Sequence, residues 1–433
     1  MTQKNHFDVD QYADALSKHG FEGPNWLNDL RNKSLDAFLD VGLPGPKVEE
    51  WKYTNLSSIK SKSYAVSQVV AGNDALSAKI QEAHLKDIQG SKVVFVDGYF
   101  NDQYSDVSEE EGLSLLPLND FLKAKPKEAE ELLKVSDEDS SLANLNSALM
   151  TDGYVINVAQ NIKLSKPIQI IHVATENSDA KALRNKNFIS MSNGSSAQII
   201  ETFIGDNNAD IWTQDINKIT VAEKASLEIF QIQTQGNETI HMAESHVEVA
   251  EDADFKHYSL NVGAKLSRTE IKPTLTGLHG NVDLRGAFLG RDGVSHDVFT
   301  HMKHLVPECE SDQIYRGVLD KGGKSAFQGK VYVAQDAQLT NAEQSNKNLL
   351  LDRDAEANSK PELLIYADDV KCAHGATVGE LDKEALFYLN SRGMDQEAAK
   401  GLLVEAFIAE VYDDVSIDAV REKYLELARG WLG

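Results

Sequence analysis

A repeated unit of strand, short turn and strand runs through residues 187–377, and it restricts the possible folds more than any other feature of the chain. Each unit alternates apolar with polar residues, is rich in Val, Ile, Thr and Phe, and lacks helical periodicity. The turn carries a small residue that returns as Ala197, Ala225 and Ala253, at intervals of 28 residues. Repeats of this length are typical of solenoids and propellers.

One strand–turn–strand unit cannot bury its apolar face alone, whereas stacked coils share one continuous core. The repeat therefore predicts a mainly β fold, a β-solenoid, and a parallel β-helix is the form that we expect. The alternative is an antiparallel β-sandwich in which the even spacing is a coincidence, because the later repeats drift from the period.

The regions on either side of the repeat have helical periodicity. Residues 9–18 and 24–39 carry apolar positions at helical spacing, and Asp382, Asp395 and Ser416 are the expected N-caps of three short C-terminal helices. Three such helices bury little by themselves, so we expect one of their faces to meet another protein or the end of the solenoid. The predicted domains are a mostly helical N-terminal domain at 1–150, a parallel β-helix at 151–378 and a helical C-terminal domain at 379–433.

An aromatic and charged cluster at residues 49–54 follows the first helical region. We interpret it as a docking segment in which Trp51 and Tyr53 are buried. A ligand-binding site is the alternative interpretation.

Composition excludes several classes of partner. The 433-residue chain has a formal net charge of −25, which repels phosphate backbones and anionic membranes, so neither nucleic acid nor a membrane is expected as a partner. Its two cysteines, Cys309 and Cys372, cannot form a disulfide framework, and no apolar run reaches the roughly 18 residues of a membrane span. The N-terminus is polar and unlike a signal peptide. We therefore expect a cytoplasmic protein.

Two further patterns resemble functional sites, a phosphate-binding loop and a histidine metal site, but do not meet their requirements. Residues 321–325 resemble the end of a phosphate-binding loop, but Val318 occupies the position where that motif requires glycine, and no helix is expected after it. We predict a solenoid turn there and no nucleotide bound by this chain itself. His296, His301 and His304 are spaced so that they do not share one face of a strand, which favours a solvated turn over a metal site.

Cys372 and His374 are the strongest candidates for chemistry. They are two residues apart in a β-type segment, so both side chains leave the same face of the strand. A thiolate and an imidazole directed at one point suit iron or zinc. Two ligands are half of a usual site, so further ligands would come from another chain or from sulfide. The alternative is a buried cysteine beside a hydrogen-bonded core histidine.

Residues 366–379, with Lys-Cys-x-His-Gly-Ala-Thr at their centre, resemble the SufB/SufD family of scaffold proteins for iron–sulfur cluster assembly. Residues 387–393 and 49–54 match the pattern of the family as well, and the resemblance extends over nearly the whole chain. The central motif is similar to that of SufD members. SufB members typically carry additional cysteines upstream, which this chain lacks.

The resemblance implies a right-handed parallel β-helix between two helical domains, and a scaffold subunit without catalytic activity of its own. It implies a heterodimer with a SufB-like chain and SufC-like ATPases held by the C-terminal helices, with Arg392, Gly393 and Met394 as expected contacts. His374, with Cys372 beside it, is implied to help form a transient iron–sulfur cluster, or to admit iron, at the interface with SufB. A flavin in the complex and a homodimer of the isolated chain are further expectations.

Two other functions stay open. A carbohydrate-active β-helix enzyme needs a groove of carboxylates and stacking aromatics, yet aromatic residues make up only 7% of the chain and no export signal is seen. A purely structural oligomerisation module, in which Cys372 and His374 are core residues, is the other alternative. One experiment separates this module from a cluster scaffold. Replacing His374 would leave the cluster yield unchanged in the module and would change it in the scaffold.

Overall fold

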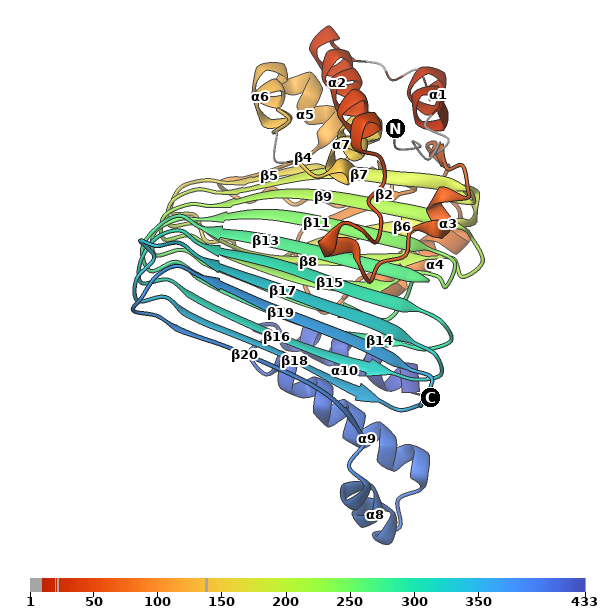
Figure 1. Ribbon diagram of the computed structural model, residues 1–433. Coiled ribbons are helices and arrows are strands. Elements are labelled where there is room, and N and C mark those ends of the chain that lie inside the picture. The colour runs from red at the N-terminus through yellow and green to blue at the C-terminus, as the bar shows by residue number, and fades with distance from the viewer. Residues whose placement is uncertain (1–9, 20, 22, 137–138, 433) are drawn as a thin grey trace, which may run out of the picture.

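The structure is a computed structural model that describes residues 10–19, 21, 23–136 and 139–432. Two long sheets face each other, and from β5 onwards each successive strand lies in the opposite sheet to the one before (Figure 1). Within each sheet, the strands from β5 and β6 to the last pair are parallel. The chain is therefore a parallel β-solenoid with helices at both ends, as the repeat predicts, and the antiparallel sandwich is wrong.

We call the two sheets sheet 1 and sheet 2. Sheet 1 contains, in spatial order, β19 (Glu356–Ile365), β17 (Lys324–Val333), β15 (Ser295–His304), β13 (Leu266–Leu275), β11 (Ile240–Val249), β9 (Ile211–Val221), β7 (Lys181–Met191), β5 (Tyr154–Val158) and β4 (Leu113–Pro117), with β1 (Ala65–Val66) beside β7. Sheet 2 contains β20 (Lys371–Glu380), β18 (Asn341–Leu350), β16 (Glu310–Leu319), β14 (Asn281–Gly290), β12 (Asp254–Asn261), β10 (Ser226–Thr234), β8 (Ser196–Gly205), β6 (Ile168–Ala174), β2 (Lys92–Val96) and β3 (Tyr99–Phe100). Because β2 and β4 precede residue 151, part of the predicted N-terminal domain joins the sheets. The domain boundaries themselves stay predictions.

The register of the strands shows how long each coil is. Ser226 pairs with Asp254, so Ala225 and Ala253, which precede them, occupy equivalent positions in successive coils. Ala197 instead pairs with Leu227, two residues beyond Ala225. All three alanines are buried, but the first interval of 28 residues is not the length of a coil. The turns absorb such differences while the strands stay in register.

Left-handed turn residues stack at the corner before the strands of sheet 2. Lys224 and Asp252 have φ angles of +58° and +53°. Their N–H groups donate to the carbonyl oxygens of Glu251 and Leu278 in the next coil, each over 2.9 Å. Asp and Asn tolerate this conformation better than most residues, which explains the polar turn that recurs along the sequence.

Helices cover the outer faces of both sheets. They are α1 (Asp10–His19), α2 (Asn25–Val41), α3 (Ser57–Lys60), α4 (Asp74–Ala83), α5 (Leu118–Ala124), α6 (Pro126–Leu132), α7 (Ser141–Leu149), α8 (Lys383–Ser391), α9 (Gln396–Ala409) and α10 (Asp418–Leu432), with 3-10 turns η1 (Glu49–Trp51), η2 (Glu176–Ser178) and η3 (Glu410–Tyr412). α2 and α7 bury Leu35 and Leu145 with Trp212 and Met242 on the outer face of sheet 1. The predicted start of the first helix at Val9 lies outside the described residues. No helix in the described part of the chain is long and apolar enough to cross a membrane.

The segment at residues 49–54 docks on the outer face of sheet 1. The Arg268 guanidinium lies 3.9 Å from the centre of the Trp51 ring and donates to Thr54 Oγ1 over 2.7 Å. It also donates to the carbonyl oxygen of Glu50 over 2.9 Å. The docking is as predicted, but its buried residue is Thr54. Trp51 and Tyr53 are only half-buried, so the prediction that both are buried is wrong.

The C-terminal helices pack on the outer face of sheet 2. The hydroxyl of Tyr412 donates to the carbonyl oxygen of Ser259 over 2.7 Å, and that of Tyr424 donates to the carbonyl oxygen of Tyr258 over 3.1 Å. The partner of these helices is thus a sheet face of the same chain and not the solenoid end. α8 differs from them, since it has no buried residue and stands away from the solenoid (Figure 1).

Candidate functional site

The solenoid ends at β20 without a further coil to cover it. β20 forms ten residue pairs with β18 and is the last strand of sheet 2, so its other edge has no partner strand in the described part of the chain. β19 and β20, the last strands of sheet 1 and sheet 2, lie at the end of the solenoid that is nearer to α8 (Figure 1). Each residue of β20 is exposed except Cys372, which is half-buried. An unpaired edge of this length is a template for pairing with another chain.

The two candidate ligands lie on the interior face of this last strand. Cys372 pairs with Ala342 and His374 with Gln344 on β18, and both of these partners are buried inside the solenoid. Side chains in register on parallel strands leave the same face. Cys372 accordingly packs against the interior core, whereas His374 is exposed because no coil follows it.

A cysteine thiol and a histidine imidazole are ligands that suit iron or zinc. Burial raises the pKa of the Cys372 thiol, against the lowering effect of a backbone hydrogen bond from Ala342. The sulfur therefore keeps its proton at neutral pH until a metal ion displaces it. Within the described residues, no group of three or more His, Cys, Asp and Glu side chains is placed to hold a metal ion. Cys372 and His374 fit iron as half of a site, and their role stays a prediction.

The prediction of a solvated turn for the three histidines is wrong. His296, His301 and His304 all lie in β15, where His296 and His304 are fully buried and point into the solenoid. Burial lowers the pKa of each of these two imidazoles to about 4, so they are neutral. Strand periodicity alone did not reveal them, because this solenoid holds many polar side chains in its interior.

The remaining sequence motifs lie at a solenoid turn and at the tip between two C-terminal helices. Residues 321–325 form a turn that leads into strand β17, as predicted, and not into a helix. Arg392 and Gly393 end α8, with Gly393 at φ +91°, and Met394 follows. All three are exposed at the tip between α8 and α9. Nothing in the structure tests their predicted contact with an ATPase.

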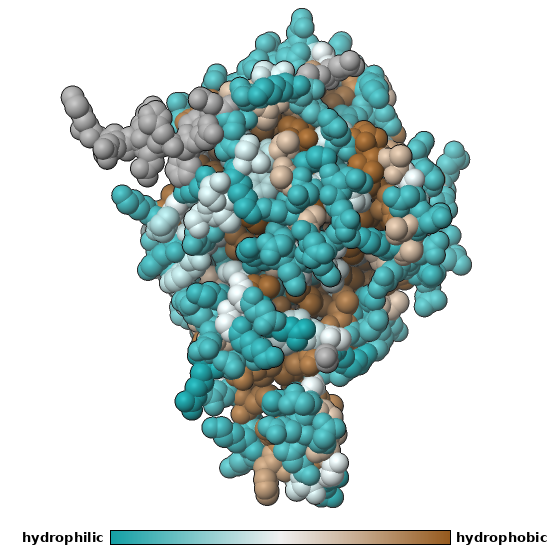
Figure 2. Space-filling view, turned by 90° about the vertical axis from the view of Figure 1, so that its right-hand side faces the viewer, coloured by the Kyte–Doolittle hydropathy of each residue, from teal (hydrophilic) through white to brown (hydrophobic). Residues whose placement is uncertain are grey.

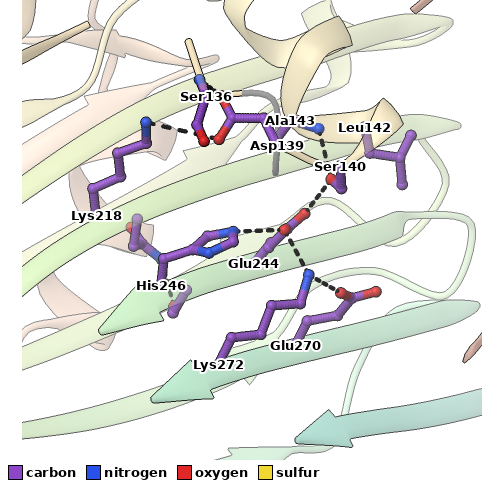
Figure 3. A network of polar contacts seen from close by, with 12 residues as sticks. Ser136, Asp139, Ser140, Leu142, Ala143, Lys218, Glu244, His246, Glu270 and Lys272 are labelled. Atoms are coloured by element: carbon purple, nitrogen blue, oxygen red, sulfur yellow. Dashed lines mark hydrogen bonds and ion pairs between the residues drawn. The ribbon is translucent and has the colours of Figure 1, made fainter. Parts of the chain in front are cut away.

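A second candidate site is a groove of about 510 Å³ on the outer face of sheet 1. Lys272 Nζ lies 2.7 Å from a carboxylate oxygen of each of the buried residues Glu244 and Glu270 (Figure 3). His246 lies 2.7 Å from Glu244 on the other side. Ser140, the N-cap of α7, donates to Glu244 over 2.7 Å. The network thus joins α7 to sheet 1.

The electrostatics of this groove do not favour a carbohydrate-cleaving enzyme. Burial raises the pKa values of Glu244 and Glu270, but Lys272, together with His246 beside Glu244 and Arg268 beside Glu270, holds both below their usual range. Both carboxylates are therefore ionised at neutral pH. Glycoside hydrolysis instead requires one carboxylic acid with a raised pKa.

Comparison with protein families decides the relationship. The family model described as "SUF system FeS cluster assembly, SufBD core domain" matches residues 172–407, which is more than half of the chain. The model described as "SufBD protein N-terminal region" matches residues 5–170. The chain belongs to the SufBD family. The resemblance seen at residues 366–379 is thereby confirmed.

Similar members of the SufBD family cover almost the full chain. A protein named as an iron–sulfur cluster assembly SufBD family protein from Synechocystis is 28% identical over 97% of this chain and 95% of its own length. The iron–sulfur cluster assembly protein SufD of Escherichia coli is 29% identical over 90% of both chains. SufD of Bacillus subtilis is 25% identical over 99% of both. Membership of the family supports a SufD-type role in iron–sulfur cluster assembly, as a scaffold.

Proposed function

We propose that this chain is the SufD-type subunit of an iron–sulfur cluster assembly complex. It pairs with a SufB-like chain through the open end of its solenoid, binds a SufC-like ATPase through α8 and α9, and is not itself an enzyme. Iron and the nascent cluster are the cargo of the complex, held at the interface between the two scaffold chains. The observation that carries this proposal is the placement of Cys372 and His374 on one face of the terminal strand β20, whose outer edge has no partner strand in the described part of the chain.

In this proposal, the edge of β20 pairs with the partner chain and its side chains bind the metal. The free edge of β20 offers backbone N–H and C=O groups to a partner strand, and pairing there covers the exposed side chains of Tyr366 and Val378. The Cys372 sulfur and the His374 imidazole supply two ligands, and the SufB-like chain or sulfide supplies the others. The thiol proton leaves when iron binds, so assembly of the site releases a proton.

Replacing His374 by Ala is expected to lower the cluster content of the co-expressed complex severalfold without preventing its assembly, because His374 is exposed and contributes nothing to the core. Iron, acid-labile sulfide and visible absorbance of the complex with its SufB-like and SufC-like partners measure this effect. Cys372→Ser is expected to act in the same direction. The same absorbance spectrum tests for a flavin.

A matched control is His279→Ala, which removes another exposed histidine from a solenoid turn. Equal cluster content in wild type and His374→Ala would show that this chain is architectural and that the chemistry lies in the partner. If wild type forms no complex, the proposal itself is wrong. A homodimer of the isolated chain through the same edge would appear as a doubled mass by light scattering.

The ATPase contact is expected on α8 and the tip that follows it. Phe387 and Tyr388 are 74% and 57% exposed, although they are large hydrophobic side chains. Figure 2 shows hydrophobic side chains gathered at the waist between the solenoid and this protruding end. Large hydrophobic side chains that stay exposed on a helix, as these two do on α8, are typical of a docking surface.

Phe387→Ser is expected to weaken binding of the SufC-like ATPase at least tenfold in a titration by calorimetry, because it removes a central aromatic contact. Val41→Ser is the control, since Val41 is 75% exposed at the end of α2, among the N-terminal helices. Arg392→Ala tests the tip. Unchanged affinity in Phe387→Ser would place the ATPase elsewhere.

A further inference from the structure

Gln344 lies on β18, the strand next to the candidate metal site. It is the register partner of His374, and Gln313 follows it on β16. Only 3% of Gln344 is exposed. Both its amide nitrogen and its amide oxygen are buried without a hydrogen-bond partner, and no other side-chain amide among the described residues has both atoms in this state.

The fold makes room for this amide. A Cβ atom on Gly329 of β17 would lie 1.9 Å from Gln344 Nε2, so no other residue fits there without moving the amide. Gly329 does not have a positive φ angle, so a side chain at this position would disturb the Gln344 amide and not the backbone of Gly329. A buried amide without a partner costs free energy of folding. This unfavourable amide lies at the end of the solenoid that carries the two candidate ligands, the exposed His374 and the half-buried Cys372.

We propose that Gln344 is a positioning residue of the metal site, whose amide oxygen accepts the N–H of the His374 imidazole when the other ring nitrogen binds iron. The inference rests on the proposed function. Adjacent strands lie about 4.8 Å apart, so side chains in register on β18 and β20 are nearest neighbours. Metal-binding histidines nearly always donate their second N–H to an oxygen, which fixes the tautomer and the ring orientation.

The test compares stability with metal binding, because the proposal predicts opposite effects on the two. Gln344→Leu removes an unpartnered buried amide, so the unfolding temperature of the isolated chain should stay the same or rise. In the co-expressed complex the same variant should bind Co²⁺ at least tenfold more weakly, as measured by the visible ligand-field bands of the metal. A merely structural role would move both quantities in the same direction.

Two further variants separate positioning from general effects on the interior. Gln344→Glu keeps an acceptor oxygen at this position and should retain Co²⁺ binding within a few-fold of wild type. Gln231→Leu is the matched control, since Gln231 is also 3% exposed with an unpartnered amide oxygen but lies on β10, in the middle of sheet 2. It should bind Co²⁺ like wild type.

The outcomes distinguish this inference from the function on which it rests. Wild-type Co²⁺ affinity in Gln344→Leu, combined with a loss in His374→Ala, would overturn the role of Gln344 and leave that of His374 intact. An equal loss in Gln231→Leu would overturn it as well, because any polar interior residue would then have the effect. Wild-type affinity in His374→Ala would contradict the proposed function itself.

Discussion

Arg268→Ala is expected to lower the free energy of unfolding by about 3–5 kcal/mol, because it breaks a buried ion pair and leaves Glu270 with Lys272 as its remaining cationic partner. The side chain of Arg268 is 1% exposed, and its Nε lies 2.8 Å from the carboxylate of Glu270. The same guanidinium donates to Thr54 and to the carbonyl oxygen of Glu50. Arg268 thus helps to fix the N-terminal segment to sheet 1, together with Asp297 and Gln328, which also contact Thr54 and Glu50. Its loss should loosen that segment.

Chemical denaturation measures the stability of this variant, and limited proteolysis measures the release of residues 49–54. Lys265→Ala is the control. Its ion pair with Glu238 has the same kind of geometry at 2.9 Å, but both side chains are about half exposed, so the expected loss is below about 1 kcal/mol. Arg268→Lys should not restore stability, since an ammonium group cannot make the several directed contacts of a guanidinium. A wild-type denaturation curve for Arg268→Ala would contradict this account.

Asp215→Asn is expected to stabilise the chain by up to about 4 kcal/mol at neutral and alkaline pH, and to have no effect near pH 4. Asp215 lies inside the solenoid on β9, and burial raises the pKa of its carboxyl to about 7, from an ordinary value of 3.8. Glu201 adds to the increase, whereas His172 and a hydrogen bond from Asn187 oppose it. Between these two pKa values the folded chain binds a proton that the unfolded chain releases. Stability therefore falls as pH rises through this window, and Asn removes the loss.

Denaturation curves of wild type and Asp215→Asn at several pH values check this prediction. Lys186→Met provides a control with the opposite dependence. Burial lowers the pKa of Lys186 to about 7, from an ordinary value of 10.5, so its cost is largest in acid and fades as pH rises through that range. A constant difference between Asp215→Asn and wild type from about pH 4 to pH 8 would show that this carboxyl does not titrate as the structure indicates.

Several features of the fold could be predicted because they depend on neighbours in sequence. Alternation of apolar and polar residues specifies a strand, and its return at a regular interval specifies stacked coils. The placement of Cys372 and His374 on one face follows from the same period of two. The N-caps Asp382 and Asp395 could be predicted for a similar reason, since capping residues lie within a few positions of the N–H groups that they satisfy. The predicted N-cap Ser416 is wrong, because α10 begins two residues later, at Asp418.

Other features could not be predicted, because they depend on residues that are distant in sequence. The interior position of His296 and His304 depends on which strand faces of distant coils enclose them. The buried residue of the docking segment is Thr54, because Arg268 and Asp297, more than two hundred residues away, both contact its hydroxyl. The buried, unpartnered amide of Gln344 could not be predicted from the sequence, because it depends on the space that Gly329 of the opposite sheet leaves for it.

The sequence by itself determined the parallel solenoid, the helical ends and the pair of candidate ligands. Only the tertiary structure decided that the C-terminal helices lie on sheet 2 and leave the solenoid end open, and that an unpartnered glutamine lies next to His374 on the neighbouring strand. The reason is physical. Periodicity fixes the direction of each side chain relative to its own strand, whereas burial and hydrogen-bond partners are set by the other coils and helices that the chain brings against it.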